Sequence, residues 1–335
     1  MTQKQRVSLG GHQKLAKLTT NFWLIATLVI MTSLIASVKP QILDVGNIAT
    51  ILRSFSILVV MVLGVTWVMA AGQIDISFMQ VAAFANMLAA ALLENGWGWG
   101  GAISISLGVG MFAGLINGLL IAYMRLPALI VTISMAGICG SAAAALGKGT
   151  VIRIADPGPI GGLFYTSIFG IIPVIILPVL VLAGLIWYIQ EKLAVGRYIY
   201  AMAQNEVAVK QAGVQVARLT VLLFIFSAAC AAMAGIMLAA NLSSGQPTIG
   251  GPYLINGLTV VLLGGMMVYV GKPNILGTLT ATLFIGVLFS GAALLGLPDY
   301  QRQIIQGLLL AAGLSVATFA SRHHSIRNKG TSHDN

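Results

Sequence analysis

Apolar residues occur in ten long stretches along the chain, and the ionisable residues lie almost entirely between these stretches or at the two ends. The hydrocarbon core of a bilayer, about 30 Å thick, is crossed by roughly 20 apolar residues in helical form. Backbone polar groups inside that core must pair within their own segment, so each stretch is expected to be a helix. The pattern predicts an all-α polytopic membrane protein with about ten transmembrane helices. The predicted spans are 22–38, 48–72, 76–93, 99–124, 128–146, 168–190, 219–241, 256–269, 274–294 and 300–320.

The composition agrees with this class and excludes an ordinary soluble domain. Of 335 residues, 58% are hydrophobic and only 8% are charged. The net charge of +10 could indicate a nucleic-acid binder, but the basic residues form no stripe and sort by topology instead. If both termini are cytoplasmic, thirteen Lys and Arg residues fall inside and five outside, in agreement with the positive-inside rule. We therefore expect cytoplasmic tails at 1–21 and 321–335, a permease domain at 22–320, and no nucleic-acid partner.

The chain lacks the residue sets that membrane enzymes and ion-coupled carriers use. All four histidines lie in the tails, and the acidic residues lie in loops, at helix ends or in a tail, with no carboxylate in the middle of a predicted span. Proton- and sodium-coupled carriers usually keep ionisable groups near the membrane midplane. Cys139 and Cys230 fall within predicted helices and are expected to be packing residues. We expect no catalytic residues, no metal and no cofactor, and we expect the energy for transport to come from outside this chain.

The longest internal connection, 191–218, carries helix signals of its own. Asn205 is a good N-cap, Glu206 places negative charge in the first turn, and Gly213 suits the residue after a helix C-terminus. The segment predicts a helix of about two turns on the membrane surface, which is too short to be stable unless it is docked. It is either an ordinary interfacial connector or a docking helix for a soluble partner.

The run Gly196-Arg197-x-x-Tyr200-Ala201-x-x-x-Asn205, followed by Gly213-Val214, resembles the cytoplasmic coupling loop of bacterial sugar ABC importer permeases. These are the ribose, xylose, arabinose and galactose group, to which furanosyl-autoinducer importers also belong. Further segments resemble motifs of that family in the same order: Ile74–Ser77, Gly114–Gly118, Pro127 with Ile130–Thr132, Gln246–Thr248 with Tyr253, Val260–Gly265 and Gly277–Thr278.

The resemblance implies a permease subunit in a bacterial inner membrane, with both termini cytoplasmic, that works by alternating access. It would pair with a second permease, identical or not, and receive a small polar solute from a periplasmic binding protein. Separate ATPase subunits would hydrolyse ATP and bind the coupling residues: Gly196, Arg197, Tyr200, Asn205, Glu206 and Gly213. The alternatives are an ABC permease for branched-chain amino acids or nucleosides, and a stand-alone secondary carrier.

Some positions depart from the family pattern. Leu254 and Asn256 stand where acidic residues are usual, and Met266-Met267 replaces a Thr-Ser pair. These departures leave the solute open, and they fit one of two unlike permeases in a heterodimer.

Small and polar residues within the spans have two possible roles. Gly110, Gly114 and Gly118 recur every four residues, a spacing that allows close helix packing in lipid. Gly264 and Gly265 pose the same choice between packing and solute contact. The polar span residues that we nominate as lining the solute pathway are Asn86, Asn117, Thr132, Ser134 and Asn241. Neutral amides and hydroxyls suit a sugar, although hydrogen bonds between helices would explain each of them equally well.

Asp75 and the external loop 147–167 are two further polar features with a candidate role. Asp75 either caps the third helix or faces the ATPase side. The external loop 147–167 is rich in Gly and Pro, which predicts turns without regular structure. Its charged residues Arg153 and Asp156 are candidates for contact with the binding protein.

Overall fold

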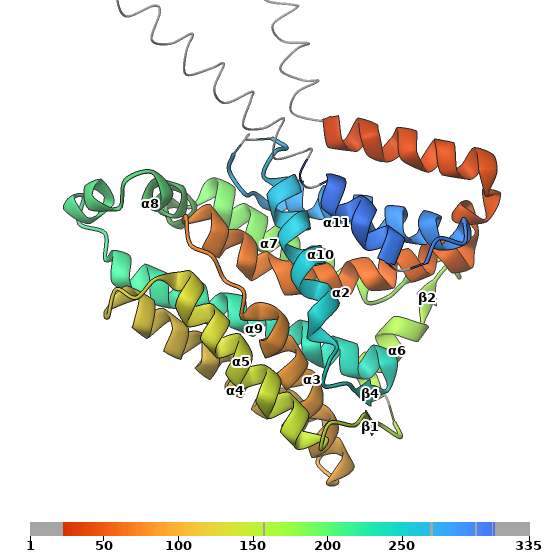
Figure 1. The fold of residues 1–335 in the computed structure, drawn as a ribbon, viewed down its shortest axis with the longest axis horizontal. Helices are drawn as coiled ribbons and strands as arrows, with labels where there is room; N and C mark the ends of the chain where they lie inside the picture. The colour runs from red at the N-terminus through yellow and green to blue at the C-terminus, as the bar shows by residue number, and fades with distance from the viewer. Residues whose placement is uncertain (1–22, 157, 269–270, 299, 310, 312–335) are drawn as a thin grey trace, which may run out of the picture.

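A computed structural model describes residues 23–156, 158–268, 271–298, 300–309 and 311, and these form an elongated bundle of helices (Figure 1). The expected all-α class is confirmed. The elements are Trp23–Val38, the 3₁₀ helix η1 (Pro40–Leu43), α2 (Val45–Ala70), α3 (Phe78–Glu94), α4 (Trp99–Ala122), α5 (Ala128–Leu146), α6 (Gly158–Tyr165), α7 (Ile176–Lys192), α8 (Ala194–Gln211), α9 (Val216–Leu242), α10 (Gly250–Gly264), α11 (Ile275–Leu294) and a last helix over residues 300–309.

Each of the ten predicted spans overlaps a helix within the described residues. By length and composition, α2, α4, α5, α9 and α11 can cross a bilayer, and α7 with α8 form a further pair that is bent by 67°. The helix Trp23–Val38, α3 and α10 are apolar but shorter. The count of ten crossings therefore stays a prediction, and both predicted tails lie outside the described residues.

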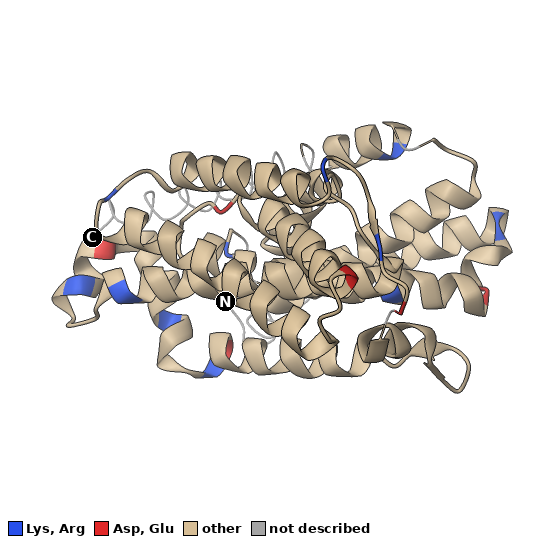
Figure 2. Ribbon diagram, turned by 90° about the horizontal axis from the view of Figure 1, so that it is seen from below, with Lys and Arg blue, Asp and Glu red and all other residues tan. Residues whose placement is uncertain are grey.

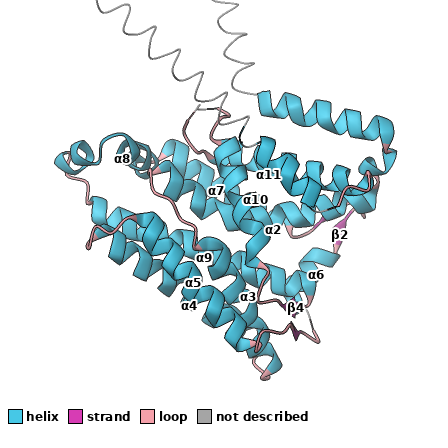
Figure 3. Ribbon diagram, viewed as in Figure 1, coloured by secondary structure: helices cyan, strands magenta, loops and turns pink. Residues whose placement is uncertain are grey.

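Short strands close one end of the bundle (Figure 3). Strand β1 (Ile152–Arg153) pairs antiparallel with β4 (Ser244–Gly245), and β2 (Ser167–Ile168) pairs with β3 (Ile172–Pro173). We call this end the β1–β4 end and the opposite one the α8 end.

The connection before α7 corrects two expectations. The loop 147–167 was expected to lack regular structure, which is wrong because it contains β1 and α6. Helix α7 begins at Ile176 rather than at 168, because the β2–β3 hairpin uses apolar residues that hydropathy alone assigns to the span. Charged residues lie mostly in the loops and at helix ends, and the long helices carry few of them along their middles (Figure 2).

Helix α9 lies at the centre of the bundle, against α2, α3 and α4. Gly110, Gly114 and Gly118 of α4 all face α9, where an added Cβ would collide with the α9 backbone or with an alanine side chain. Gly235 of α9 lies equally close to the backbone of Ala82 in α3. Small residues thus bring these helix backbones together, as is common where helices pack within lipid.

The same order of elements occurs twice along the chain. The 26-residue α2 is followed by a non-helical segment, the short α3, then α4 and α5; the 27-residue α9 is followed by a non-helical segment, the short α10, then α11 and the last helix. The first turn of α3 packs on the first half of α10 inside the bundle: Gly250, at the start of α10, packs on Met79, and Gly257, two turns further along, packs on Phe78. From that meeting point α3 runs to the β1–β4 end and α10 to the α8 end. In transporters, interrupted helices of this kind often surround the solute site.

Candidate coupling element and solute cavity

Helix α8 turns sharply away from α7, and a glycine makes the turn possible. Gly196 lies in the first turn of α8, directly against the backbone of Gln190 in α7, with no room for a Cβ. Any larger residue would force the two helices apart at the bend.

The helix is divided at Asn205, as its capping signal predicts. Asn205 has non-helical backbone angles (φ −156°, ψ 92°), and its Oδ1 accepts a hydrogen bond from the backbone nitrogen of Ala208 at 3.0 Å. Gly213 follows the helix end with φ +86°, a conformation that favours glycine. The predicted short helix is present between these two signals. Residues 194–204 are also helical, which the sequence reasoning did not anticipate.

The bend between α7 and α8 is fixed to the connection between α10 and α11. The hydroxyl of Tyr200 donates to the carbonyl of Pro273 at 3.0 Å, and Lys272 Nζ lies 5.7 Å from the centre of the Tyr200 ring. Gln190 donates to the same Pro273 carbonyl at 3.4 Å and accepts from the backbone nitrogen of Ile275 at 3.0 Å. Sequence reasoning selected Tyr200 from the family motif but missed Gln190, which lies at the end of an apolar span.

The two faces of α8 differ. Ile199, Met202 and Val209 are buried, whereas Arg197 and Glu206 are exposed. The exposed charges are therefore accessible to another protein or to lipid headgroups.

Three of the nominated pathway residues are buried and have partners in other elements of the fold. Asn86 donates to the carbonyls of Gly235 and Ser244 and accepts from the backbone nitrogen of Gln246 at 2.7 Å. Asn117 donates to the Ser77 hydroxyl at 3.0 Å, and Thr132 lies near the Ile74 carbonyl at 3.5 Å.

The other two nominated residues lie nearer the surface. Ser134 is exposed and donates to the carbonyl of Ile130 in its own helix, and Asn241 is half-buried. A pathway role for all five stays a prediction. Gly264 packs against Gly277 and Gly265 against Pro273, so both lie where α10 meets α11.

Asp75 is only 1% exposed and lies within the bundle, so the reading in which it faces an ATPase is wrong. Its Oδ1 accepts from the backbone nitrogen of Ser77 at 2.8 Å and from the Ser77 hydroxyl. These bonds fix the turn directly before α3. Its Oδ2 accepts from Ser227 of α9 at 2.7 Å. Ser227 is the twelfth of 27 residues in α9, so a carboxylate does lie near mid-bundle. The absence of mid-span carboxylates in the sequence is therefore no argument against an ion-coupled carrier.

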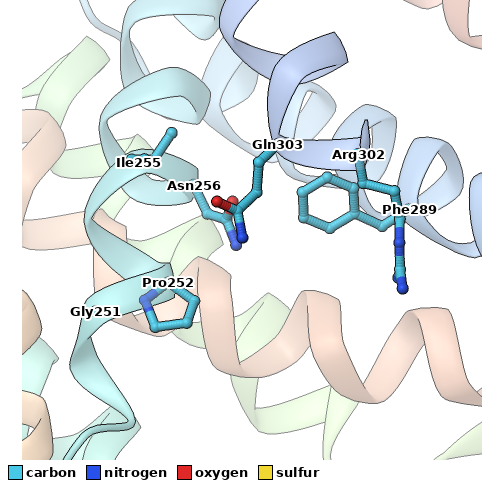
Figure 4. A pocket seen from close by; sticks show the side chains of 7 residues that line it. All are labelled: Gly251, Pro252, Ile255, Asn256, Phe289, Arg302 and Gln303. Carbon is cyan, nitrogen blue, oxygen red and sulfur yellow. The ribbon is translucent and has the colours of Figure 1, made fainter. Parts of the chain in front are cut away.

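A cavity of about 320 Å³ lies between α10, α11 and the last helix (Figure 4). Asn256 and Gln303 point toward one another across it, and the Phe289 ring and Arg302 form another part of its lining. Gly251, Pro252 and Ile255 complete it. This volume is at the lower end of the range of small-molecule pockets. None of the five nominated pathway residues lines it, although Asn256 had been noted as a departure from the family pattern.

The family described as "Branched-chain amino acid transport system / permease component" matches residues 47–313. The chain belongs to this permease family. It is a multi-pass membrane protein and a transport subunit without catalytic activity of its own. Family membership removes the stand-alone carrier, which the position of Asp75 would have left open.

Curated relatives match the permease over most of its length. The ribose import permease protein RbsC of Bacillus subtilis is 30% identical over 318 residues, covering 92% of this chain and 94% of the relative. RbsC of Escherichia coli strain K12 is 28% identical, covering 89% and 95%. The autoinducer 2 import system permease protein LsrD of Photorhabdus laumondii is 28% identical, covering 92% and 93%.

A solved structure supports the fold. An ABC transporter described as metal-chelate type, in an inward-facing conformation, aligns with a TM-score of 0.52 and 17% identity, covering 90% of this chain and 99% of that one. At this identity the likeness concerns the fold alone.

Proposed function

We propose that this permease is the translocating subunit of an ABC importer for a neutral, sugar-like solute, and that α8 receives force from ATPase subunits. The observation that carries the proposal is the geometry of α8. It bends 67° away from α7, buries one face against the bundle and leaves Arg197 and Glu206 exposed. The buried face docks α8 on the bundle, and the exposed charges are accessible to a protein surface.

The contacts of α8 give a route for mechanical coupling. As the ATPase subunits close on ATP, they would displace α8, and Tyr200 would pull on the Pro273 carbonyl. Gln190, bonded on both sides of that point, would move with it. Pro273 lies two residues before α11, so the displacement would reach a membrane helix directly.

The orientation follows from the same proposal. The α8 end would face the cytoplasm and the ATPase subunits, which agrees with the thirteen-to-five distribution of basic residues. The β1–β4 end would face the periplasm and a solute-binding protein. A second permease, identical or different, would complete the pathway.

The solute class rests on the relatives and on the cavity. The relatives are named for ribose and autoinducer 2. The two carboxamides of Asn256 and Gln303 could bond to hydroxyl groups, and the Phe289 ring could pack against the apolar face of a sugar. A branched-chain amino acid is the second candidate, because the family carries that description.

The coupling role can be tested by altering both capping residues of the second part of α8. The pair Asn205→Ala and Gly213→Ala removes the side-chain cap and strains a left-handed position, so we expect the ATPase subunit to be lost during co-purification. Asn95→Ala with Gly96→Ala is a matched control, because Gly96 also has positive φ but ends α3 at the other end.

In proteoliposomes, the intact complex should accumulate labelled ribose in preference to leucine when ATP and a binding protein are supplied. Full ATPase affinity in the Asn205/Gly213 variant, or uptake by the permease alone, would contradict the proposed coupling.

A further inference from the structure

The segment Ala71–Ser77, which we call the α2–α3 break, takes an unusual path through the bundle. Helix α2 passes Ser227 of α9 at Gly64 and ends six residues later at Ala70. The chain then turns back and returns without regular structure to the level of Ser227, where α3 begins. The break therefore occupies the half of the bundle, toward the α8 end, that a full-length α3 would fill.

Side-chain hydrogen bonds hold the end of the break that leads into α3. Asn117 of α4 donates to the Ser77 hydroxyl at 3.0 Å, that hydroxyl donates to Asp75, and Ser227 of α9 donates to the other carboxylate oxygen at 2.7 Å. A buried carboxylate is costly unless such donors satisfy it. Its two oxygens here bind the break to two neighbouring helices, α9 directly and α4 through Ser77.

The depth of this network places it inside the membrane. Ser227 lies nine residues beyond Arg218, or roughly 14 Å along the helix axis at 1.5 Å per residue. Non-helical backbone at such depth is tolerated only where protein surrounds it. Asp75 therefore stands at a depth where an apolar residue would be expected.

The end of the break that follows α2 lies against α8. An added Cβ on Gly72 would lie 3.1 Å from the Cα of Ala203, and Gly72 has φ +80°. Backbone therefore abuts backbone here, with no flexible side chain between them to absorb a displacement. Gly72 and Asp75 are only three residues apart, so the α8 contact and the hydrogen-bond network belong to one short segment.

We propose that the α2–α3 break transmits movement of α8 to the middle of the bundle, and that Asp75 is the positioning residue that passes this movement to α9 and α4. The inference rests on the proposed function, because it assumes that α8 moves with the ATPase cycle. It adds a second route beside the Tyr200–Pro273 contact, and it gives the buried carboxylate a role in transport rather than in folding alone.

The test compares solute moved with ATP hydrolysed in proteoliposomes that contain the whole complex. Asp75→Asn keeps the size of the side chain but removes its charge, and Ser227→Ala removes only the bond to α9. We expect both variants to retain the ATPase subunit and basal hydrolysis, while solute moved per ATP falls about tenfold, as for loss of one charge-assisted hydrogen bond. Ser106→Ala is the matched control, because Ser106 is fully buried in α4 and its hydroxyl has no partner among the described residues.

The double variant should transport no less per ATP than the worse of the two single variants, because the Ser227 hydroxyl acts through its bond to Asp75. Wild-type transport per ATP in both Asp75→Asn and Ser227→Ala would overturn the inference. Equal losses of hydrolysis and transport, with a lowered unfolding temperature, would also overturn it, since they indicate a structural role only. Failure of the wild-type complex to transport would instead count against the proposed function.

Discussion

At the scale of single residues, glycine and asparagine determine where helices approach and where they end. Gly114 and Gly108 lie on the same helix, α4, but only Gly114 faces α9; a Cβ added to Gly108 would meet nothing within 4 Å. The same residue type therefore has opposite consequences for stability on the two faces of α4.

Gly114→Ala should destabilise the permease by about 1–3 kcal/mol, because the added methyl group overpacks the α4–α9 contact. Gly108→Ala should be neutral or stabilising by up to about 1 kcal/mol, because alanine is the better helix former. Thermal unfolding in detergent measures both effects. Equal shifts in the two variants would show that α4 does not pack on α9 through Gly114.

Asn256→Ala should raise the solute concentration for half-maximal uptake about tenfold, the usual cost of losing one or two hydrogen bonds. ATPase co-purification should be unchanged, because the cavity is remote from α8. Gln301→Ala is the control, since Gln301 is in the same helix as Gln303 but does not line the cavity. Equal effects of the two variants would remove the cavity from the solute pathway.

At the scale of elements, the sequence predicted helix ends, which depend on neighbouring residues, but not contacts between residues far apart in the chain. Asn205 and Gly213 act on their own backbone, so their positions predicted the short helix correctly. Asp75 could not be placed, because a polar segment between two spans was assumed to lie at the surface, whereas the α2–α3 break returns into the bundle. The cavity was missed because its lining comes from residues as far apart as 251 and 303.

The connection that carries β1 gives a prediction at this scale. Arg153 is exposed at the β1–β4 end, in register with Ser244. Arg153→Glu should weaken uptake driven by the binding protein, because it reverses a charge on the proposed docking surface, while ATPase co-purification stays normal. Lys148→Glu reverses another exposed charge in the same connection and shows whether the effect is specific to Arg153. Unchanged uptake in the Arg153 variant would exclude this connection from the docking surface.

At the scale of the whole molecule, the proposed orientation can be measured directly. Both cysteines, Cys139 and Cys230, are buried, so background labelling should be low. In intact cells, a membrane-impermeant maleimide should label Lys148→Cys but not Lys210→Cys, since the two lie at opposite ends. Permeabilised cells should show both labelled. The reverse pattern in intact cells would place α8 outside and end its assignment as the ATPase contact.

The antiparallel pairing of β1 with β4 joins the connection after α5 to the connection after α9 by main-chain bonds. Main-chain pairing of this kind resists shear more than isolated side-chain contacts do. We therefore expect these two connections to move together as one unit at the β1–β4 end during the transport cycle.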